Sequence, residues 1–593
     1  MELAASIEPF LCPLAAFLDP NDNDFYRLCQ AEHNELVNEN QSTLIWGLSA
    51  CNPCNRVNAF SSKTDHSWRV DGSTAMGRQL FITPTFLLPE LPVKRIDLII
   101  PCQSKHPTGI RRMLRSSALY HVSSASVRQL EIVQYLEHIL SRWSSGIPYF
   151  DQIYKAVPFG SRIVVEELAA DINKIKVRLI PNKGFAEKLV PLVHLYNLWK
   201  LPAGSWPVSV PVEDLQHISH LNGNVSVVQL PHKHGSELFV FKTNLREPNS
   251  IYHELKLLLT MAPHPNIIPK PRYVVTTADD GAPSPRLLGF ILDYYGSGTL
   301  QSVLEGNSRL PLRTKMRWAM QIVRTMSAIS ESPAQFYSDL KPDNLMLTQD
   351  GLDLVFIDFE QAGNWDTFLA PELSYQLWME NLSHNPGVPL AQRERYENIL
   401  KIVGRHGSGE DVLGPTDTFR NSWKSLPPPE REQAMVFTVG KILWCIFEEV
   451  AHTRNSTDER YEKETPIEFP AFSRTPESLR SLIQRCTMGA PEWTLKAEYK
   501  IIREDLRFVS VPTSGVIGAG DECTPHEAVY AAKRMWTCRV RQMQDFMETR
   551  ARWLAGASVE GDDVILGYPC RPSLAQVLSF LKLEDKGKDA AEA

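Results

Sequence analysis

The spacing of apolar residues predicts a mixture of helices and strands in the first third of the chain. Residues 126–143 place apolar side chains at the three- and four-residue intervals of an amphipathic helix. Residues 162–165 and 175–180 are rich in β-branched residues and predict strands, and residues 189–199 predict a second helix. Turn-forming residues at 200–207 then indicate a domain boundary.

A hairpin and a further helix are predicted directly after this boundary. The β-branched run 225–230 and the apolar run 239–242 are separated by turn-forming residues, as in two antiparallel strands. The helical pattern of residues 251–259 follows, and an apolar run at 290–293 leads into glycine-rich residues 296–298. The second strand ends in a lysine, and the helix carries a glutamate 12 positions later.

The second half of the chain has the patterns of several helices separated by polar stretches. Residues 437–444, 479–486 and 527–553 predict helices, the last with a basic face that we expect to be solvated. Residues 376–433 contain glycine-rich and proline-rich runs, so we expect part of this stretch to be loop. The polar residues 584–593 are expected to fray.

Composition limits the classes of protein to which the chain can belong. Its 593 residues exceed one ordinary domain and indicate two or three. The contents of 43% hydrophobic and 22% charged residues are those of a globular protein. The net charge of −7 gives no basic footprint, so we expect no nucleic-acid partner.

Cysteine spacing and hydropathy favour a cytoplasmic or nuclear location. The 10 cysteines are scattered and do not form a disulfide framework. The C-x-x-C at residues 51–54 has no second pair, which favours ordinary thiols over a zinc or redox site. No apolar run is long enough to span a bilayer, and residues 10–18 lack the basic leader of a signal peptide.

The most informative chemistry lies in two short segments. The run Tyr-Ser-Asp-Leu-Lys-Pro-Asp-Asn places Asp339, Lys341 and Asn344 in one loop, and a strand-like run then delivers Asp358. Phosphoryl transfer from a nucleotide needs a carboxylate for the hydroxyl proton, a cation near the migrating phosphate and oxygen ligands for Mg²⁺. These four side chains supply all three.

The two segments resemble the H-R-D-L-K-P-D-N and D-F-G motifs of eukaryotic protein kinases. Further motifs follow the kinase order over residues 212–585, among them Ala-Pro-Glu at 370–372 and the apolar run 437–444, which resembles the buried helix of the large lobe. The resemblance implies an α+β, two-lobed protein-kinase-like fold with a small β-rich lobe and a large helical lobe. It also implies that Arg571 pairs with Glu372.

The resemblance implies ATP and Mg²⁺ as cofactors and assigns a role to each motif residue. Asp339 would accept or orient the hydroxyl proton, and Lys341 would neutralise charge on the γ-phosphate. Asn344 and Asp358 would hold Mg²⁺. The remaining expected nucleotide contacts are the lysine of the third strand with its helix glutamate, the phosphate-covering loop and the hinge: Lys242, Glu254, Leu221, Gly223, Ser226, Val228, Leu292, Asp293 and Tyr295.

Several residues depart from the kinase pattern. Only Gly223 survives of the three loop glycines, whose lack of a side chain lets the backbone approach the phosphates. Ser338 replaces an arginine that normally grips a phosphorylated activation segment, so control by phosphorylation of that segment is not expected. Glu360 replaces the glycine of D-F-G, where it can fix one state of the loop or add a ligand. Met435 falls where the buried helix usually carries an aspartate that orients the catalytic loop.

The leading hypothesis is ATP-dependent phosphoryl transfer to protein serine or threonine hydroxyls. Lysine two positions after the catalytic aspartate favours this specificity, by resemblance. The alternative is a pseudokinase that binds nucleotide or acts as a scaffold, which the lost glycines and Glu360 support. A small-molecule kinase is a third reading, and the L-K-P-D-N run argues against it. The Y-S-D-L-K-P-D-N and D-F-E forms are also similar to those of uncharacterised kinase-like proteins of filamentous fungi.

The motifs divide the chain into an extension, a catalytic-type domain and a tail. Residues 1–205 form an N-terminal mixed α/β extension whose apolar helix faces we expect to pack on the small lobe, with a regulatory or docking role. Residues 206–585 form the protein-kinase-like domain, with insertions at about 376–433 and 487–569, and residues 586–593 form a polar tail. No motif indicates the protein substrate.

Overall fold

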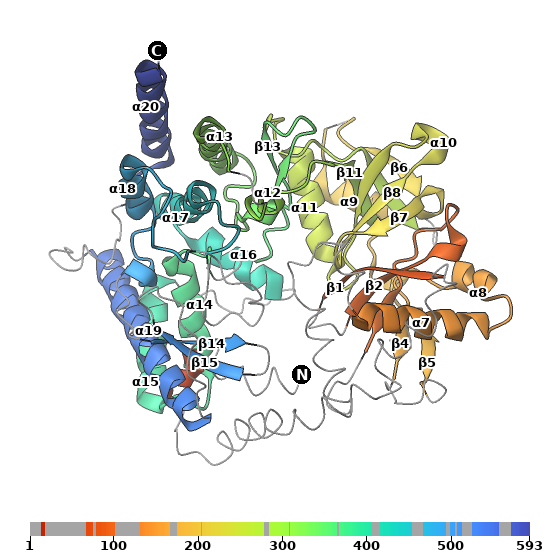
Figure 1. Cartoon of the computed structure of the whole chain (residues 1–593), viewed down its shortest axis with the longest axis horizontal. Helices are drawn as coiled ribbons and strands as arrows, with labels where there is room; N and C mark the ends of the chain where they lie inside the picture. The colour runs from red at the N-terminus through yellow and green to blue at the C-terminus, as the bar shows by residue number, and fades with distance from the viewer. Residues whose placement is uncertain are drawn as a thin grey trace.

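The structure is a computed structural model in which two lobes and an N-terminal module are arranged side by side (Figure 1). It describes residues 13–17, 67–74, 79–100, 131–166, 175–202, 204–277, 284–306, 309–363, 367–404, 415–453, 467–493, 499–504, 507–512, 525–556 and 571–592. The C-x-x-C at residues 51–54 lies outside these ranges.

In the described part of residues 68–180, which we call the N-terminal module, a five-stranded sheet is covered by two helices. Its strands follow the order β1-β2-β3-β4-β5. The apolar face of its longer helix, which includes Leu136 and Leu140, packs on Leu98 and Ile163 of this sheet. The helix predicted at 126–143 therefore exists but covers its own sheet and not the small lobe. The elements are β1 (Trp68–Thr74), β2 (Gln79–Pro84), β3 (Asp97–Ile99), α7 (Glu131–Ser145), α8 (Phe150–Ala156), β4 (Arg162–Val165) and β5 (Val177–Ile180).

The small lobe is a six-stranded sheet with the order β6-β10-β11-β9-β8-β7. One face of the sheet is covered by α11, which lies beside α9 from the N-terminal extension (Figure 1). The predicted hairpin is present, and a short helix forms its turn. The elements are α9 (Leu192–Trp199), β6 (Val208–Pro211), β7 (Gln216–His220), β8 (Val225–Gln229), α10 (Pro231–His234), β9 (Leu238–Lys242), α11 (Pro248–Thr260), β10 (Tyr273–Thr277) and β11 (Arg286–Asp293).

The large lobe is built around α17, whose residues from Ala434 to Glu448 are all buried. A helix that is apolar on all sides belongs in the centre of a domain, so the buried helix predicted from residues 437–444 is confirmed. One continuous apolar core joins α17 to α11 of the small lobe. The elements are α12 (Leu300–Leu304), α13 (Leu312–Ser330), β12 (Leu345–Leu347), β13 (Leu354–Phe356), α14 (Pro371–His384), α17 (Pro428–Glu448), α18 (Glu477–Cys486) and α20 (Leu574–Glu592).

The two insertions contain more regular structure than the sequence indicates. The described parts of residues 376–433 are mainly helical, because α14 continues into them and two further helices follow. The predicted helix at 527–553 is present as α19, and the tail expected to fray continues α20 to Glu592. No helix in the described ranges is long and apolar enough to cross a membrane. The added elements are α15 (Leu390–Val403), α16 (Pro415–Ser425), β14 (Tyr499–Glu504), β15 (Arg507–Pro512) and α19 (Pro525–Leu554).

Candidate active site

Lys242, at the end of β9, joins the two lobes through its ammonium group. Its Nζ atom lies 2.7 Å from Oε2 of Glu254 on α11 and 2.7 Å from Oδ1 of Asp358, which follows β13. The backbone N–H of Phe359 donates to the other carboxylate oxygen of Glu254 over 3.0 Å. The expected pairing of Glu254 with Lys242 is confirmed, and the same glutamate also binds the segment that carries Asp358.

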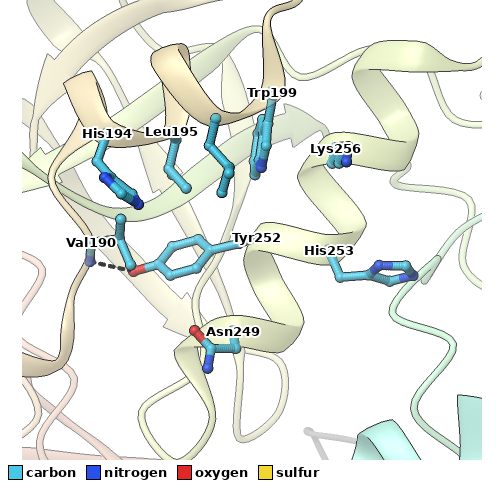
Figure 2. A pocket seen from close by; sticks show the side chains of 9 residues that line it. Val190, His194, Leu195, Trp199, Asn249, Tyr252, His253 and Lys256 are labelled. Carbon is cyan, nitrogen blue, oxygen red and sulfur yellow. Dashed lines mark hydrogen bonds between the residues drawn. The ribbon is translucent and has the colours of Figure 1, made fainter. Parts of the chain in front are cut away.

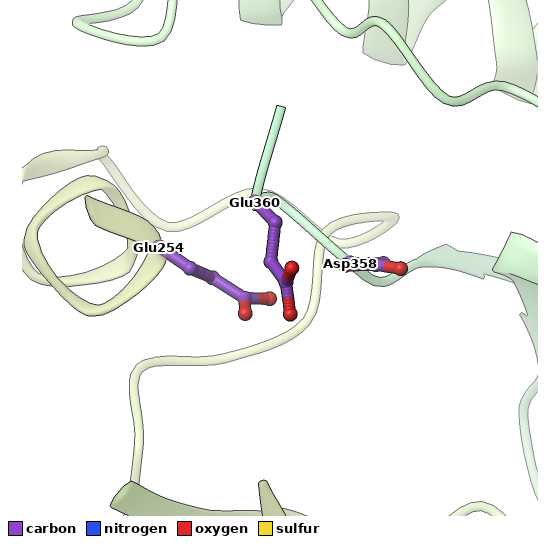
Figure 3. Close-up of side chains that lie close together, drawn as sticks. All are labelled: Glu254, Asp358 and Glu360. Carbon is purple, nitrogen blue, oxygen red and sulfur yellow. The ribbon is translucent and has the colours of Figure 1, made fainter. Parts of the chain in front are cut away.

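Glu360 adds a third carboxylate to this cluster, with Oε1 3.1 Å from Nζ of Lys242. Figure 3 shows the carboxylates of Glu254 and Glu360 next to each other, with Asp358 beside Glu360. One carboxylate oxygen from each of the three residues lies within 4.8 Å of the others. The ammonium group contacts all three, so Lys242 serves as their counter-ion in this state. Burial, with three carboxylates around one ammonium, raises the pKa of Glu254 to about 7. The same carboxylates raise the pKa of Lys242 above its usual value, although burial opposes this.

The catalytic loop holds Asp339 between a cation and an amide. Nζ of Lys341 lies 3.0 Å from Oδ2 of Asp339, and Nδ2 of Asn344 donates to the same oxygen over 2.8 Å. Nδ2 also donates to the Asp339 carbonyl over 2.9 Å. Burial raises the pKa of Asp339 to about 6, an effect that Lys341 opposes and Asp358 reinforces.

The short hairpin of β12 and β13 brings the two expected metal ligands together. Asn344 precedes β12 and Asp358 lies just beyond β13, and the backbone N–H of Ile357 donates to the Asn344 carbonyl over 3.1 Å. Because the amide nitrogen of Asn344 bonds to Asp339, its oxygen is the atom left for a cation. One amide oxygen and one carboxylate at the same hairpin end fit Mg²⁺, which prefers few protein oxygens and keeps water or phosphate ligands.

Gln361 holds the catalytic loop, a role that the sequence analysis missed. Its side-chain amide donates to the carbonyl oxygens of Ala334 over 3.0 Å and Phe336 over 2.7 Å. Its Oε1 lies 3.0 Å from Nε2 of His253 on α11. Met435, where an aspartate was expected to orient this loop, is buried in α17. Gln361, which follows the D-F-E segment and is not part of α17, supplies hydrogen bonds that hold this loop. No sequence motif indicates this positioning role.

The first insertion also supports this loop. Trp423 of α16 stacks on Phe336, with ring centroids 5.0 Å apart and planes within 4°. Arg420 of the same helix donates to the backbone carbonyl of Glu360 over 3.2 Å. Arg431 of α17 donates to the side chain of Gln335 over 2.8 Å. The inserted helix is therefore part of the scaffold of the site.

The predicted pair of Arg571 and Glu372 is confirmed. Two guanidinium nitrogens of Arg571 donate to the two carboxylate oxygens of Glu372 over 2.6 and 3.1 Å. Both side chains are at most 1% exposed. This bidentate contact joins the chain just before α20 to the first turn of α14.

The hinge residues lie along the end of β11. Leu292 is buried and paired with Val240 of β9, so it shares the sheet face of Lys242. Asp293 forms an ion pair with Arg272 over 2.7 Å, which fixes the exit of the strand. Tyr295 is partly buried against the main core. Leu292 and Lys242 therefore lie on the same face of the sheet, and the role of Leu292 at the back of a nucleotide pocket stays a prediction.

The phosphate-covering hairpin differs from the expectation for Ser226 and Val228. In the register of β8 and β9, Val225 is paired with Lys242 and Val227 with Val240. Since successive side chains of a strand alternate between faces, Ser226 and Val228 point away from the face of Lys242. Counting the motif from Val228 was off by one position for the side chains. The other two predicted loop residues lie in the connection between β7 and β8, where Leu221 is exposed and Gly223 occupies the turn.

A separate pocket of about 300 Å³ lies between α9 and α11. Figure 2 shows Tyr252 extending toward Val190, whereas His253 leaves α11 on the other side, away from the α9 side chains. The Tyr252 hydroxyl accepts from the Val190 N–H over 3.1 Å and donates to the Leu287 carbonyl over 3.0 Å. α11 is thus bonded to Val190 of the extension through Tyr252 and to Gln361 through His253.

Residues 222–370 match the family model of the protein kinase domain. A search of the curated proteins found no match. The matched residues include the turn between β7 and β8, the Lys242 cluster and the catalytic loop. By its α+β two-lobed fold and this match, the chain is similar to protein kinases, whose general chemistry is phosphoryl transfer.

Proposed function

We propose that this protein transfers the γ-phosphoryl group of ATP to serine or threonine hydroxyls of a protein substrate. The observation that carries the proposal is the contact of Lys242 with both Glu254 and Asp358, each over 2.7 Å. A scaffold has no need for a buried lysine that joins a small-lobe helix to a metal-ligand aspartate. We also propose that the protein belongs to the lineage of fungal kinase-like proteins that the Y-S-D-L-K-P-D-N and D-F-E forms suggest. This resemblance does not indicate a substrate.

In this proposal each polar side chain has one task. Asp339 receives the proton of the attacking hydroxyl, and its raised pKa suits a group that takes up a proton. Lys341 neutralises charge on the phosphate in transfer, while Lys242 binds the α- and β-phosphates. Asn344 and Asp358 would hold Mg²⁺, which when bound neutralises phosphate charge and aligns the oxygens. Lys341, beside Asp339, favours serine or threonine over tyrosine by resemblance only.

The test is phosphate transfer by the purified full-length protein with Mg²⁺ and labelled ATP. We expect labelling of a peptide pool, and we expect Asp339→Ala and Asp358→Ala each to reduce it to background, because the proton acceptor or a metal ligand is lost. Circular dichroism and thermal melting should show that both variants remain folded. Wild-type protein that labels neither itself nor any peptide would contradict the proposal.

The second candidate function is that of a pseudokinase that binds nucleotide without transferring phosphate. The observation that favours it is Glu360, whose carboxylate lies 3.1 Å from Lys242, where phosphate oxygens would have to bind. In this case an ATP analogue with Mg²⁺ raises the melting temperature while no labelling occurs.

A further inference from the structure

The N-terminal module contacts the β7–β8 hairpin along strand β7. The backbone N–H of His217 donates to the Leu91 carbonyl over 2.8 Å, and Pro92 forms an antiparallel bridge with Gln216. Figure 1 shows β2 of the module beside β7. The module therefore contacts the hairpin that the kinase resemblance places above the nucleotide phosphates.

A bulge in β1 directs Asp71 toward this hairpin. Val70 is paired with Ile82 and Gly72 with Phe81, so Asp71 is the extra residue between them. Bulges redirect a side chain in this way. The Asp71 carboxylate accepts from Oγ1 of Thr83 over 2.8 Å and from the backbone N–H of His220 over 2.9 Å.

A second bulge, in β7, faces the first. The strand register shifts between His217 and Ser219, which places His217 and His220 on the same face although they are three residues apart. Arg69 of β1 donates to the carbonyl of the bulged residue Ile218 over 2.6 Å. Oγ1 of Thr83 lies 3.1 Å from Nε2 of His217. The bulge in β1 and the bulge in β7 therefore lie at the contact between these two strands.

The contacts extend to Ser226 on β8 through His220, which a buried arginine also contacts. Nδ1 of His220 lies 2.8 Å from Nη1 of Arg95 and 2.9 Å from Oγ of Ser226. Because a guanidinium group only donates, Nδ1 of His220 is an acceptor. We call Asp71, Thr83, Arg95, His217, His220 and Ser226 the polar seam; each is at most 4% exposed.

Phe81 carries the contact from the seam to the turn of the hairpin. The guanidinium carbon of Arg95 lies 4.6 Å from the centre of the Phe81 ring. The ring also packs on Gly72, where an added Cβ would lie 3.2 Å from it. The tip of the ring lies 3.9 Å from the position of a Cβ at Gly223. The ring is therefore held in place and reaches the turn that contains Gly223.

We propose that Asp71, Phe81 and Arg95 are positioning residues for the nucleotide, and that the N-terminal module is a fixed backing that holds the β7–β8 hairpin over the ATP phosphates. This inference rests on the proposed function, because it assumes that the cleft binds ATP. A hairpin with one glycine has fewer ways to fold over the phosphates than one with three. Because the module holds the β7–β8 hairpin in place before ATP binds, binding does not have to order the hairpin and loses less conformational entropy. The module therefore raises nucleotide affinity.

The experiment compares Phe81→Ala with Phe86→Ala in the full-length protein. Both remove a phenyl ring from the same module, but Phe86 is 42% exposed and packs on Trp68 and Phe150, away from the hairpin. Affinity for a non-hydrolysable ATP analogue with Mg²⁺ is measured by calorimetry. We expect Phe81→Ala to weaken binding about five- to tenfold, whereas Phe86→Ala stays within about twofold of wild type.

Two further measurements separate positioning from folding. Phe81→Leu keeps an apolar side chain in the module but does not reach Gly223, so it should remain folded and still weaken binding. Hydrogen exchange at residues 221–224 should accelerate in both Phe81 variants, and KM for ATP should rise while kcat stays within about twofold. Folded Phe81 variants with wild-type nucleotide affinity would overturn the inference.

The outcomes also distinguish this inference from the proposed function. Wild-type protein that binds the analogue but transfers no phosphate contradicts the kinase proposal alone, and the inference is then decided by the Phe81 variants. Wild-type protein that transfers phosphate, with Phe81 variants of unchanged affinity, contradicts the inference alone. Wild-type protein that binds no nucleotide contradicts both.

Discussion

At the scale of single residues, the most consequential departure from the kinase pattern is Glu360. Its carboxylate shares Lys242 with Glu254 and Asp358, so the lysine has one more negative partner than its two motif residues provide. A nucleotide must draw Lys242 toward its phosphates while a third carboxylate stands beside them. In this structure Lys242 is therefore paired with three carboxylates, and a phosphate group would have to compete with them for the ammonium.

We expect Glu360→Gln to strengthen binding of ATP with Mg²⁺ about three- to tenfold, because it removes a buried negative charge near the phosphates but keeps the size of the side chain. Calorimetry or fluorescence titration of the nucleotide measures this effect. Glu477→Gln, at a side chain that is 88% exposed, is the matched control and should leave affinity unchanged. Weaker binding by Glu360→Gln would instead indicate that the carboxylate helps to hold the metal ion.

At the scale of elements, the contact of β1 and β2 with β7 contains two buried histidines. Burial lowers the pKa of His217 to about 3 and lowers that of His220 well below its usual value. Arg69, Arg95 and Asp71 face them across the seam. Burial therefore favours the neutral form of both imidazoles in the folded protein, whereas a histidine of the unfolded chain takes up a proton near pH 6.5.

Acid should therefore weaken this contact. Between pH 6.5 and 3 the unfolded chain binds a proton that folded His217 does not, so the free energy of unfolding falls as the pH falls, by up to about 1.4 kcal/mol per pH unit for this residue. His220 contributes in the same direction. Thermal melting at pH 7.5 and pH 5.0 measures the loss. His217→Gln should show a smaller loss than wild type, while His232→Gln, at an exposed position, should not differ. Equal losses in all three proteins would show that these histidines do not titrate on unfolding.

The elements also show where inference from sequence succeeds and fails. The sequence predicted the roles of Lys242, Glu254 and Asp358 because each residue belongs to a short motif whose structure depends mainly on neighbouring residues. The register of β8 could not be predicted from the sequence. A shift of one residue in the pairing moves every side chain to the other face of the sheet, while the sequence of the strand stays the same. Gln361 and Phe81 act through contacts with residues distant in sequence, and no local pattern records such contacts.

At the scale of the whole molecule, the ion pair of Arg571 and Glu372 joins residues 199 positions apart. We expect Glu372→Gln to lower the free energy of unfolding by about 3–5 kcal/mol, because it leaves a buried guanidinium without its counter-ion. Urea unfolding followed by tryptophan fluorescence measures this effect. Glu548→Gln, in the solvent-exposed pair with Arg395, should change stability by less than about 1 kcal/mol. Similar effects of the two substitutions would contradict the argument.

The fastening of α11 bears on which compounds can enter the cleft. This helix is tied by the hydroxyl of Tyr252 on one side and by Glu254 and His253 on the other. Under the proposed function, a synthetic inhibitor that reaches behind Leu292 by pushing α11 outward must break all of these contacts. A flat compound that stays beside Leu292 breaks none, so screening should favour that smaller chemotype.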